Sequence, residues 1–157
     1  MLYKNPSIYN SVDNDNAEKK TFKFSSNNII TQTKYNSYLN NSNCEFILYL
    51  KNGIGVLSGW FTPSSSFNVS YSSSDIGGDS AWPVIFLLDV TDIKTTNFYY
   101  QVSFLYKGDT PNNNHEFVCS TIVLMDYNNR KYLSIGTHAV QLNSNRAYNL
   151  NPSTLIL

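Results

Sequence analysis

Charged side chains are scarce in this sequence of 157 residues. Asp, Glu, Lys and Arg make up 14% of it, and eleven basic residues balance eleven acidic ones. Without a basic excess, the chain lacks the electrostatic footprint of a protein that binds nucleic acid or an anionic membrane surface. We therefore expect no nucleic acid among its partners and no membrane insertion. Solubility must come from neutral polar groups, chiefly 22 Asn and 20 Ser.

Cysteine and long apolar runs are also sparse. Cys44 and Cys119 lie far apart, each in a strand-like run, which favours buried free thiols over a disulfide. No apolar run reaches the length of a membrane-spanning helix, since Asp89 interrupts VIFLLDV. The first ten residues show neither the apolar core nor the cleavage pattern of a signal peptide, so we expect none.

Motifs of catalysis and metal binding are missing as well. The sequence has no GxSxG, HExxH or CxxC motif and no glycine-rich phosphate loop. Asp89 and Asp92 are the closest candidates for an acid pair, but Asp at a strand end commonly bonds its own backbone in a turn. His115 and His138, which a nucleophilic triad would require, both fit strand edges. We expect no enzymatic activity, no cofactor and no metal. A glycan depolymerase is the least favoured alternative, and substrate cleavage abolished by Asp89→Asn would support it.

Aromatic residues, by contrast, are abundant, and two aromatic-rich runs flank the clearest structural signal. Asn52-Gly53 is the dipeptide that best tolerates the two positive φ angles of a type I′ turn between antiparallel strands. With these two residues as the loop, the register places Phe46 opposite Gly59. One face of this hairpin must then be buried, and it carries Phe46, Leu48, Leu50 and Leu57. We expect the hairpin to fix the register of a sheet rather than to touch a ligand.

Short strand-like runs separated by Gly, Asn and Ser turns follow one another along the rest of the chain. No apolar period with helix caps extends beyond about two turns. Nine or ten strands are expected, within 21–24, 28–33, 44–51, 54–61, 67–71, 82–90, 97–106, 116–125, 131–139 and 146–157. This pattern predicts an all-β domain, an antiparallel β-sandwich or jelly-roll-like head, over residues 20–157. Residues 1–19 are interpreted as an extended arm or connector, and NSYLNNSN, residues 36–43, as a polar loop before the hairpin.

Three loops carry groups suited to binding sugars, and together they are the candidate binding surface, since loops at one end of a sandwich can supply the groups needed. A sugar is held by an aromatic ring against its C–H face, while Asn, Asp and Arg side chains bond its hydroxyls. The candidates are Asp75, Asp79 and Trp82 in loop 72–82, Asn113 and His115 in loop 107–115, and Tyr127, Asn129 and Arg130 in the hairpin tip 126–131. Each has a structural alternative when taken alone: Trp82 could cap the core, and Asn128-Asn129 could simply form a turn.

The stretch CEFILYLKNGIGVLSGWFTPSSSF, from Cys44 to Phe67, resembles the C-terminal heads of tailed-phage receptor-binding proteins and tail fibres. The shared pattern is a strand, an Asn-Gly turn, an apolar strand ending in a Gly-aromatic step, and a Ser/Pro-rich turn. YLSIG and the tail AYNLNPSTLIL continue in the order such heads show, so the resemblance covers residues 40–157. Adenovirus-type fibre heads are also similar. The chain departs from the phage pattern in having IGGDSAWPV where a Leu-Pro-Gly-aromatic-Arg-Pro segment often follows the second strand.

This resemblance implies a viral head, in the virion at a tail fibre or baseplate tip, that attaches to host-surface saccharide without enzymatic activity. It also implies a homotrimer, whose N-terminal arms would join other virion subunits. Composition agrees with assembly, because an aromatic-rich surface with few charges at its strand edges gains from burial by symmetry. The alternative is a structural virion protein, a capsid or baseplate jelly roll whose loops contact other subunits.

Overall fold

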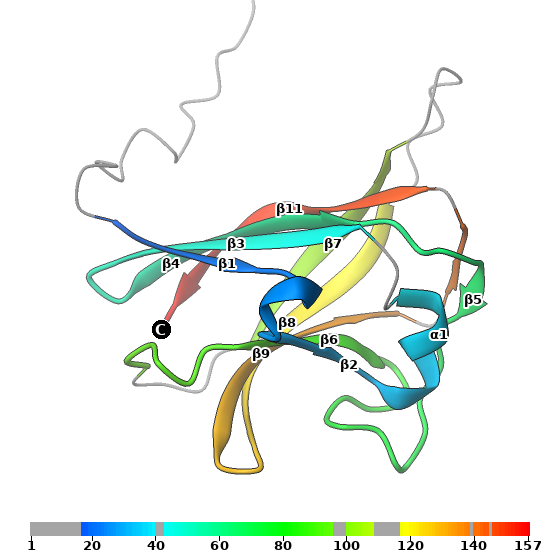
Figure 1. The fold of residues 1–157 in the computed structure, drawn as a ribbon, viewed down its shortest axis with the longest axis horizontal. Coiled ribbons are helices and arrows are strands. Elements are labelled where there is room, and N and C mark those ends of the chain that lie inside the picture. The colour runs from blue at the N-terminus through cyan, green and yellow to red at the C-terminus, as the bar shows by residue number, and fades with distance from the viewer. Residues whose placement is uncertain (1–16, 40–42, 96–99, 109–116, 139, 145) are drawn as a thin grey trace, which may run out of the picture.

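The computed structural model describes residues 17–39, 43–95, 100–108, 117–138, 140–144 and 146–157, with the backbone alone at 100, 104–108 and 117. In this part of the chain the backbone forms eleven strands and one short helix (Figure 1). The elements are β1 (Glu18–Phe22), β2 (Ile29–Thr31), α1 (Asn36–Leu39), β3 (Cys44–Lys51), β4 (Ile54–Phe61), β5 (Phe67–Asn68), β6 (Val84–Asp89), β7 (Tyr100–Gly108), β8 (Phe117–Tyr127), β9 (Arg130–Thr137), β10 (Gln141–Leu142) and β11 (Ala147–Ile156). The predicted all-β class is confirmed.

Nine strands form one antiparallel sheet, in the order β1-β3-β4-β11-β7-β8-β9-β6-β2, and β5 pairs with β10 in a small second sheet. The large sheet bends over, so that its β1-β3-β4 portion lies across from β6 and β2 (Figure 1). The Phe86 ring of β6 lies 5.2 Å from the Phe46 ring of β3 and 4.9 Å from the Phe61 ring of β4, measured between centroids. The sandwich is thus built largely from two portions of one sheet, with the core between them.

One side chain joins the two edge strands of this sheet. Asn28, just before β2, donates from Nδ2 to the Thr21 carbonyl of β1 at 2.8 Å. The side-chain oxygen, Oδ1, accepts from the Lys23 backbone N–H at 3.0 Å. The backbone carbonyl of Asn28 accepts from the Asp89 backbone N–H at 2.9 Å. The amide therefore provides the donor and the acceptor that a neighbouring strand would otherwise supply.

The β3–β4 hairpin has the predicted turn and register. Asn52 and Gly53 have φ angles of 53° and 77°, as a type I′ turn requires. Phe46 pairs with Gly59, as predicted. The most deeply buried residues on the inner face are Phe46, Leu48, Leu57 and Phe61. The turn dipeptide and the alternation of apolar residues were sufficient to fix this element.

Most other strands also lie where the sequence predicts them. β6 is buried along its whole length, and β7, β8 and β9 form consecutive antiparallel pairs. β11, the last strand in the sequence, lies between β4 and β7 in the middle of the sheet. β1 begins at Glu18, within the expected arm 1–19, while residues 1–16 lie outside the described part. The expected strand 67–71 is reduced to the two residues of β5.

The segment before β3 differs from the expected polar loop. A 3₁₀ turn, Thr33–Tyr35, leads directly into α1. Tyr35 and Leu39 are 2% and 0% exposed, and the Tyr35 ring lies 5.0 Å from that of Phe67. Two apolar residues in a polar stretch are too few to establish a helical period, so the sequence did not reveal this part of the core.

Both cysteines are free, as predicted. Cys44 is half-buried, and this burial raises the pKa of its thiol to about 11, so the thiol stays protonated at neutral pH. Cys119 is exposed, so the expectation that both thiols are buried is wrong. Its neighbour Ser120 is fully buried, and alternation along β8 turns Cys119 to the other face.

Candidate functional site

Loop 72–82 covers part of the outer face of the sheet. Beneath it lies a second small cluster of buried side chains, with Ile76 of the loop and Met125 of β8 packed against it. The buried members are Val84, Leu87 and Tyr132. A Cβ added at Gly77 would lie only 2.8 Å from Met125 Sδ, which shows how closely the loop approaches the sheet. The loop is therefore a packed cover for β6, β8 and β9.

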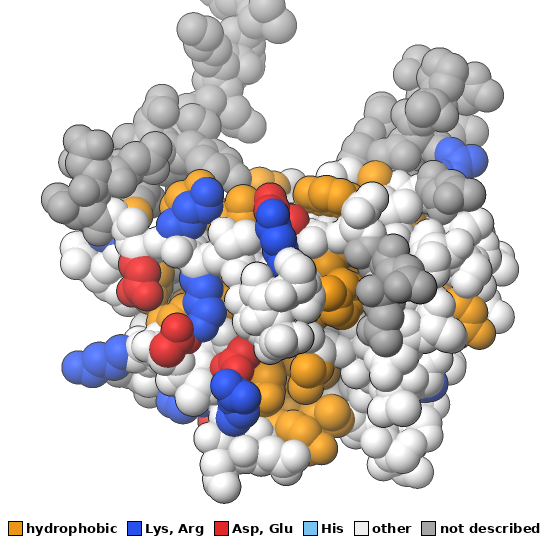
Figure 2. Space-filling model, viewed as in Figure 1, with side chains coloured by type: hydrophobic (Ala, Val, Ile, Leu, Met, Phe, Trp, Pro, Cys, Tyr) orange, Lys and Arg blue, Asp and Glu red, His pale blue; other side chains and the backbone are white. Residues whose placement is uncertain are grey.

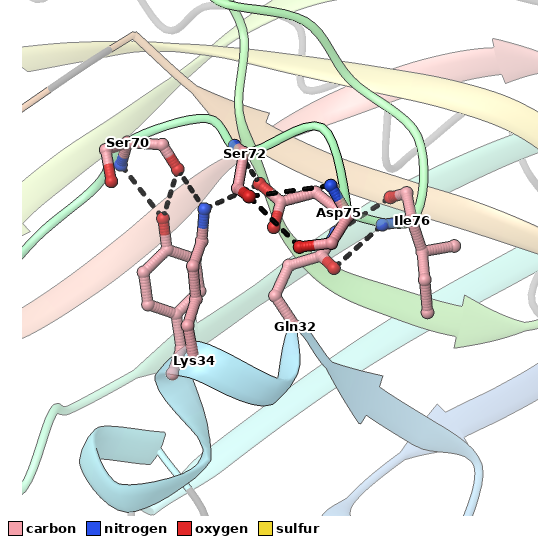
Figure 3. A network of polar contacts seen from close by, with 8 residues as sticks. Gln32, Lys34, Ser70, Ser72, Asp75 and Ile76 are labelled. Carbon is pink, nitrogen blue, oxygen red and sulfur yellow. Dashed lines mark hydrogen bonds and ion pairs between the residues drawn. The ribbon is translucent and has the colours of Figure 1, made fainter.

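Polar contacts from the 3₁₀ turn and the residue before it fix the start of this loop (Figure 3). Gln32 is 2% exposed; its Nε2 donates to the Ile76 carbonyl at 2.7 Å, and its Oε1 accepts from the Ile76 N–H at 2.9 Å. Asp75 Oδ2 accepts from Lys34 Nζ at 2.5 Å and from the Ser72 N–H at 2.8 Å. We call this network the latch. The Asp75 side chain is only 5% exposed, so it holds the loop in place, and we withdraw it from the candidate ligand residues.

The latch extends one residue further along the turn. Tyr35 Oη donates to the Ser70 carbonyl at 2.8 Å and accepts from the Ser70 N–H at 2.9 Å, while Lys34 Nζ donates to the same carbonyl. Side chains from one turn thus replace a strand partner for the backbone of residues 70–76.

Asp79 and Trp82 lie at the end of loop 72–82. Asp79 Oδ1 accepts from the Ala81 N–H at 2.8 Å and the Trp82 N–H at 2.9 Å, which stabilises a tight turn. The half-buried Trp82 ring makes an edge contact with His138, with 6.0 Å between ring centroids. Asp79 is exposed, but one of its oxygens serves the turn, so Trp82 offers the larger unused contact area.

The hairpin tip projects from the end of β8 and β9 (Figure 1). Asn128 and Asn129 have φ angles of 49° and 59° and form a type I′ turn, which was the alternative interpretation of these two residues. Tyr127 is 36% exposed, and an Arg130 guanidinium nitrogen lies 2.6 Å from Asp89 Oδ2. The tip therefore presents a ring, two amides and a guanidinium group on a rigid support.

Asp89 supports this tip and makes the predicted strand-end turn. Its Oδ1 accepts from the Thr91 N–H at 3.0 Å and the Thr91 hydroxyl at 2.7 Å. Burial raises the pKa of Asp89, but the Thr91 hydrogen bonds and the charges of Arg130 and Lys20 outweigh it and lower the pKa below its ordinary value. Asp92 is paired with Lys20 instead. The two carboxylates therefore have separate structural partners.

The three predicted loops do not gather at one end of the sandwich. Loop 107–115 falls between β7 and β8, whereas the tip joins β8 to β9, so the two lie at opposite ends of β8, a strand of 11 residues. At about 3.3 Å per residue, roughly 30 Å separates those ends. The Trp82 ring contacts His138, which follows the end of β9, whereas Arg130 is the first residue of β9. Trp82 and Arg130 therefore lie at opposite ends of this strand. Asn113 and His115 lie outside the described residues. The expected single surface is thus divided.

A further surface, which no sequence pattern predicted, lies at Trp60. Trp60 is 37% exposed on the outer face of β4, directly opposite Glu45 of β3. It lines a depression of about 330 Å³ together with Lys23, Phe24 and other residues. Alternation along the hairpin does place Trp60 and Glu45 on the outer face. What it could not reveal is that the 3₁₀ turn Phe24–Ser26 lies beside them.

Two further kinds of feature, a cluster of metal ligands and a membrane-spanning helix, are absent from the part of the chain that the structure describes. Within it, no group of three or more His, Cys, Asp and Glu side chains could hold a metal ion. None of its helices has the length and hydropathy needed to cross a membrane. No protein-family model matches the sequence, and no curated protein matches it.

Proposed function

We propose that the protein is a viral receptor-binding head, of the tailed-phage type, that attaches non-covalently to host-surface saccharide. The observation that carries this proposal is the projecting tip of the β8–β9 hairpin. Its turn residues are fixed by their backbone geometry, and Arg130 is held by Asp89. Groups fixed in advance lose little conformational entropy when they bind, which favours a useful affinity from few contacts.

The chemistry of the tip suits a neutral polyhydroxylated ligand. The Tyr127 ring can cover the C–H face of a sugar, while the Asn128 and Asn129 amides each offer a donor and an acceptor to neighbouring hydroxyls. Figure 2 shows acidic and basic side chains interspersed on the face it draws, in keeping with a formal net charge of zero. Single contacts of this kind are weak, so attachment would depend on many copies acting together.

Tyr127→Ala is expected to weaken binding to host-wall polysaccharides on a glycan array by about tenfold, because it removes the ring that stacks on the sugar. Tyr71→Ala is the matched control, since Tyr71 is another exposed tyrosine, at 43%, away from the tip. The control should bind like the unmodified protein. Equal losses in both variants would refute the role of the tip, and no binding at millimolar ligand would count against saccharide altogether.

A second candidate function, a structural virion subunit, is favoured by an exposed apolar pair on the outer face of the sheet. Ile54 of β4 and Ile156 of β11 are register partners and are 51% and 59% exposed. They border an open depression of about 800 Å³ that Glu18 also lines. Chain assembly through this end would remove both side chains from water and bring the start of β1 in each copy together. The homotrimer we propose for the receptor-binding head would use the same contact.

Light scattering of the full chain at micromolar concentration should give the mass of a trimer. Ile54→Asp combined with Ile156→Asp should shift it towards the monomer, because carboxylates cannot be buried at an apolar contact without a partner. Val102→Asp, at a 50% exposed site on β7, is the matched control and should leave the mass unchanged. A monomer for the unmodified chain would contradict the trimer. Higher-order assembly without glycan binding would favour the structural role.

A further inference from the structure

The depression beside Trp60 has the form of a small-ligand site. Its volume of about 330 Å³ lies at the lower end of the range of about 300–1,000 Å³ that is usual for such sites. The exposed Trp60 indole forms part of its lining, and Phe24 and the half-buried Cys44 contribute apolar or neutral surface. A ligand of one or two rings would fill it.

The polar groups around the indole are held in place but retain bonding capacity. Lys23 Nζ lies 2.5 Å from Glu45 Oε2, which orients the carboxylate. Among the residues that the structure describes, Glu45 Oε1, the Trp60 indole N–H and the Ser25 hydroxyl make no hydrogen bond. The Asn43 amide adds one more donor and acceptor at the rim. These groups can therefore bond a ligand without first giving up a partner within the protein.

The charges at the rim limit what kind of ligand fits. Glu45 disfavours an anion, and Lys23, which is 46% exposed beside it, disfavours a cation. A neutral ligand is repelled by neither charge. It can use both members of the ion pair, because one of its hydroxyls can donate a hydrogen bond to the carboxylate and another can accept one from the ammonium group. An apolar ligand would displace water from the ion pair without replacing the hydrogen bonds of that water. The combination selects a neutral molecule with one C–H face and several hydroxyls.

We propose that this depression binds one neutral sugar ring, stacked on Trp60 and hydrogen-bonded by Glu45, Lys23 and Asn43. The inference rests on the proposed saccharide-binding function and deepens it, because it places a sugar contact on the outer face of the β3–β4 hairpin. The hairpin is then more than a scaffold. The site is independent of the β8–β9 tip and shares no residue with it.

The sequence contains only two tryptophans, so the fluorescence of a variant without Trp82 reports on Trp60 alone. In Trp82→Phe, Trp60 is the sole indole. We would titrate this variant with methyl glycosides of glucose, galactose, mannose, rhamnose and N-acetylglucosamine to high millimolar concentration, following tryptophan fluorescence and saturation-transfer NMR. At least one glycoside should change the Trp60 emission and receive saturation from the protein. Glu45→Gln in the same background should weaken that binding by about tenfold, because it weakens the hydrogen bond that the ligand hydroxyl donates.

Variants of Trp60 in a Tyr127→Ala background, which lacks the stacking ring of the tip, complete the test. Trp60→Ala in this background should lose the saturation transfer while remaining folded by circular dichroism, since the side chain lies on the outer face, and Trp60→Phe should recover part of it. If every neutral glycoside leaves the Trp60 signal unchanged, or if choline or acetate alone changes it, the inference is overturned. Saturation transfer that Tyr127→Ala alone abolishes would also overturn it and leave the tip function standing. Failure of all sugars with all variants would remove the proposed function too.

Discussion

Phe86→Ala is expected to lower the free energy of unfolding by about 3–5 kcal/mol, the usual cost of removing a fully buried phenylalanine ring. Phe86 is 0% exposed and contacts rings from three other segments: Phe24 at 6.4 Å, Phe46 at 5.2 Å and Phe61 at 4.9 Å between centroids. These neighbours belong to the 3₁₀ turn Phe24–Ser26, to β3 and to β4. Since all three are anchored elsewhere, they cannot collapse together into the cavity.

Urea denaturation followed by fluorescence measures this loss. Tyr71→Ala removes an aromatic ring of similar size from an exposed position and should change stability by no more than about 0.5 kcal/mol. A loss for Phe86→Ala close to that of Tyr71→Ala would mean that the two layers are not held together through this ring.

Gly59→Ala is expected to destabilise the fold by about 2–3 kcal/mol, because a methyl group there meets backbone as well as side chain. A Cβ at Gly59 would lie 2.4 Å from Phe46 Cδ1 and 2.5 Å from the Glu45 carbonyl oxygen. The phenylalanine ring could turn away only at the expense of the core. The carbonyl belongs to β3 and could move only with the strand.

Gly55→Ala in the same strand provides the comparison. There the nearest atoms are the ends of two leucine side chains, Leu48 Cδ1 at 3.0 Å and Leu157 Cδ1 at 3.2 Å, which can shift by small rotations. Its loss of stability in the same urea measurement should be clearly smaller than that of Gly59→Ala. Equal losses would show that β3 yields as easily as a side chain.

Local signals were sufficient for the hairpins. Asn52-Gly53 and Asn128-Asn129 occupy turns that need positive φ angles, and few other residue pairs adopt them at so little strain. Once a turn is placed, the alternation of side chains fixes the register and the buried face, which is why Phe46 was assigned to the core correctly. The exposed position of Tyr127 follows from the same reasoning.

Contacts between segments that are distant in the sequence could not be predicted from it. Asp75 lies in a polar, Ser-rich loop and looked free to bind a ligand, yet Lys34, its partner in the latch, lies 41 residues away in a segment without any period. The depression at Trp60 likewise needs the turn after β1 to lie beside β3 and β4. Neither neighbourhood leaves a pattern within one stretch of residues, since each lies beside a pairing of strands that are distant in the sequence, β1 with β3 and β2 with β6.

The central place of β11 has a consequence for how the protein is made. β4 and β7 are complete after residue 108, but the strand that lies between them ends only at Ile156. On the ribosome, both strands must therefore wait with open edges while the chain between them is synthesised, and open edges are where nascent chains associate wrongly. The sheet cannot close progressively from the N-terminus. It closes in one late step, when β11 has been synthesised and is inserted, so the domain folds only after this strand has left the ribosome.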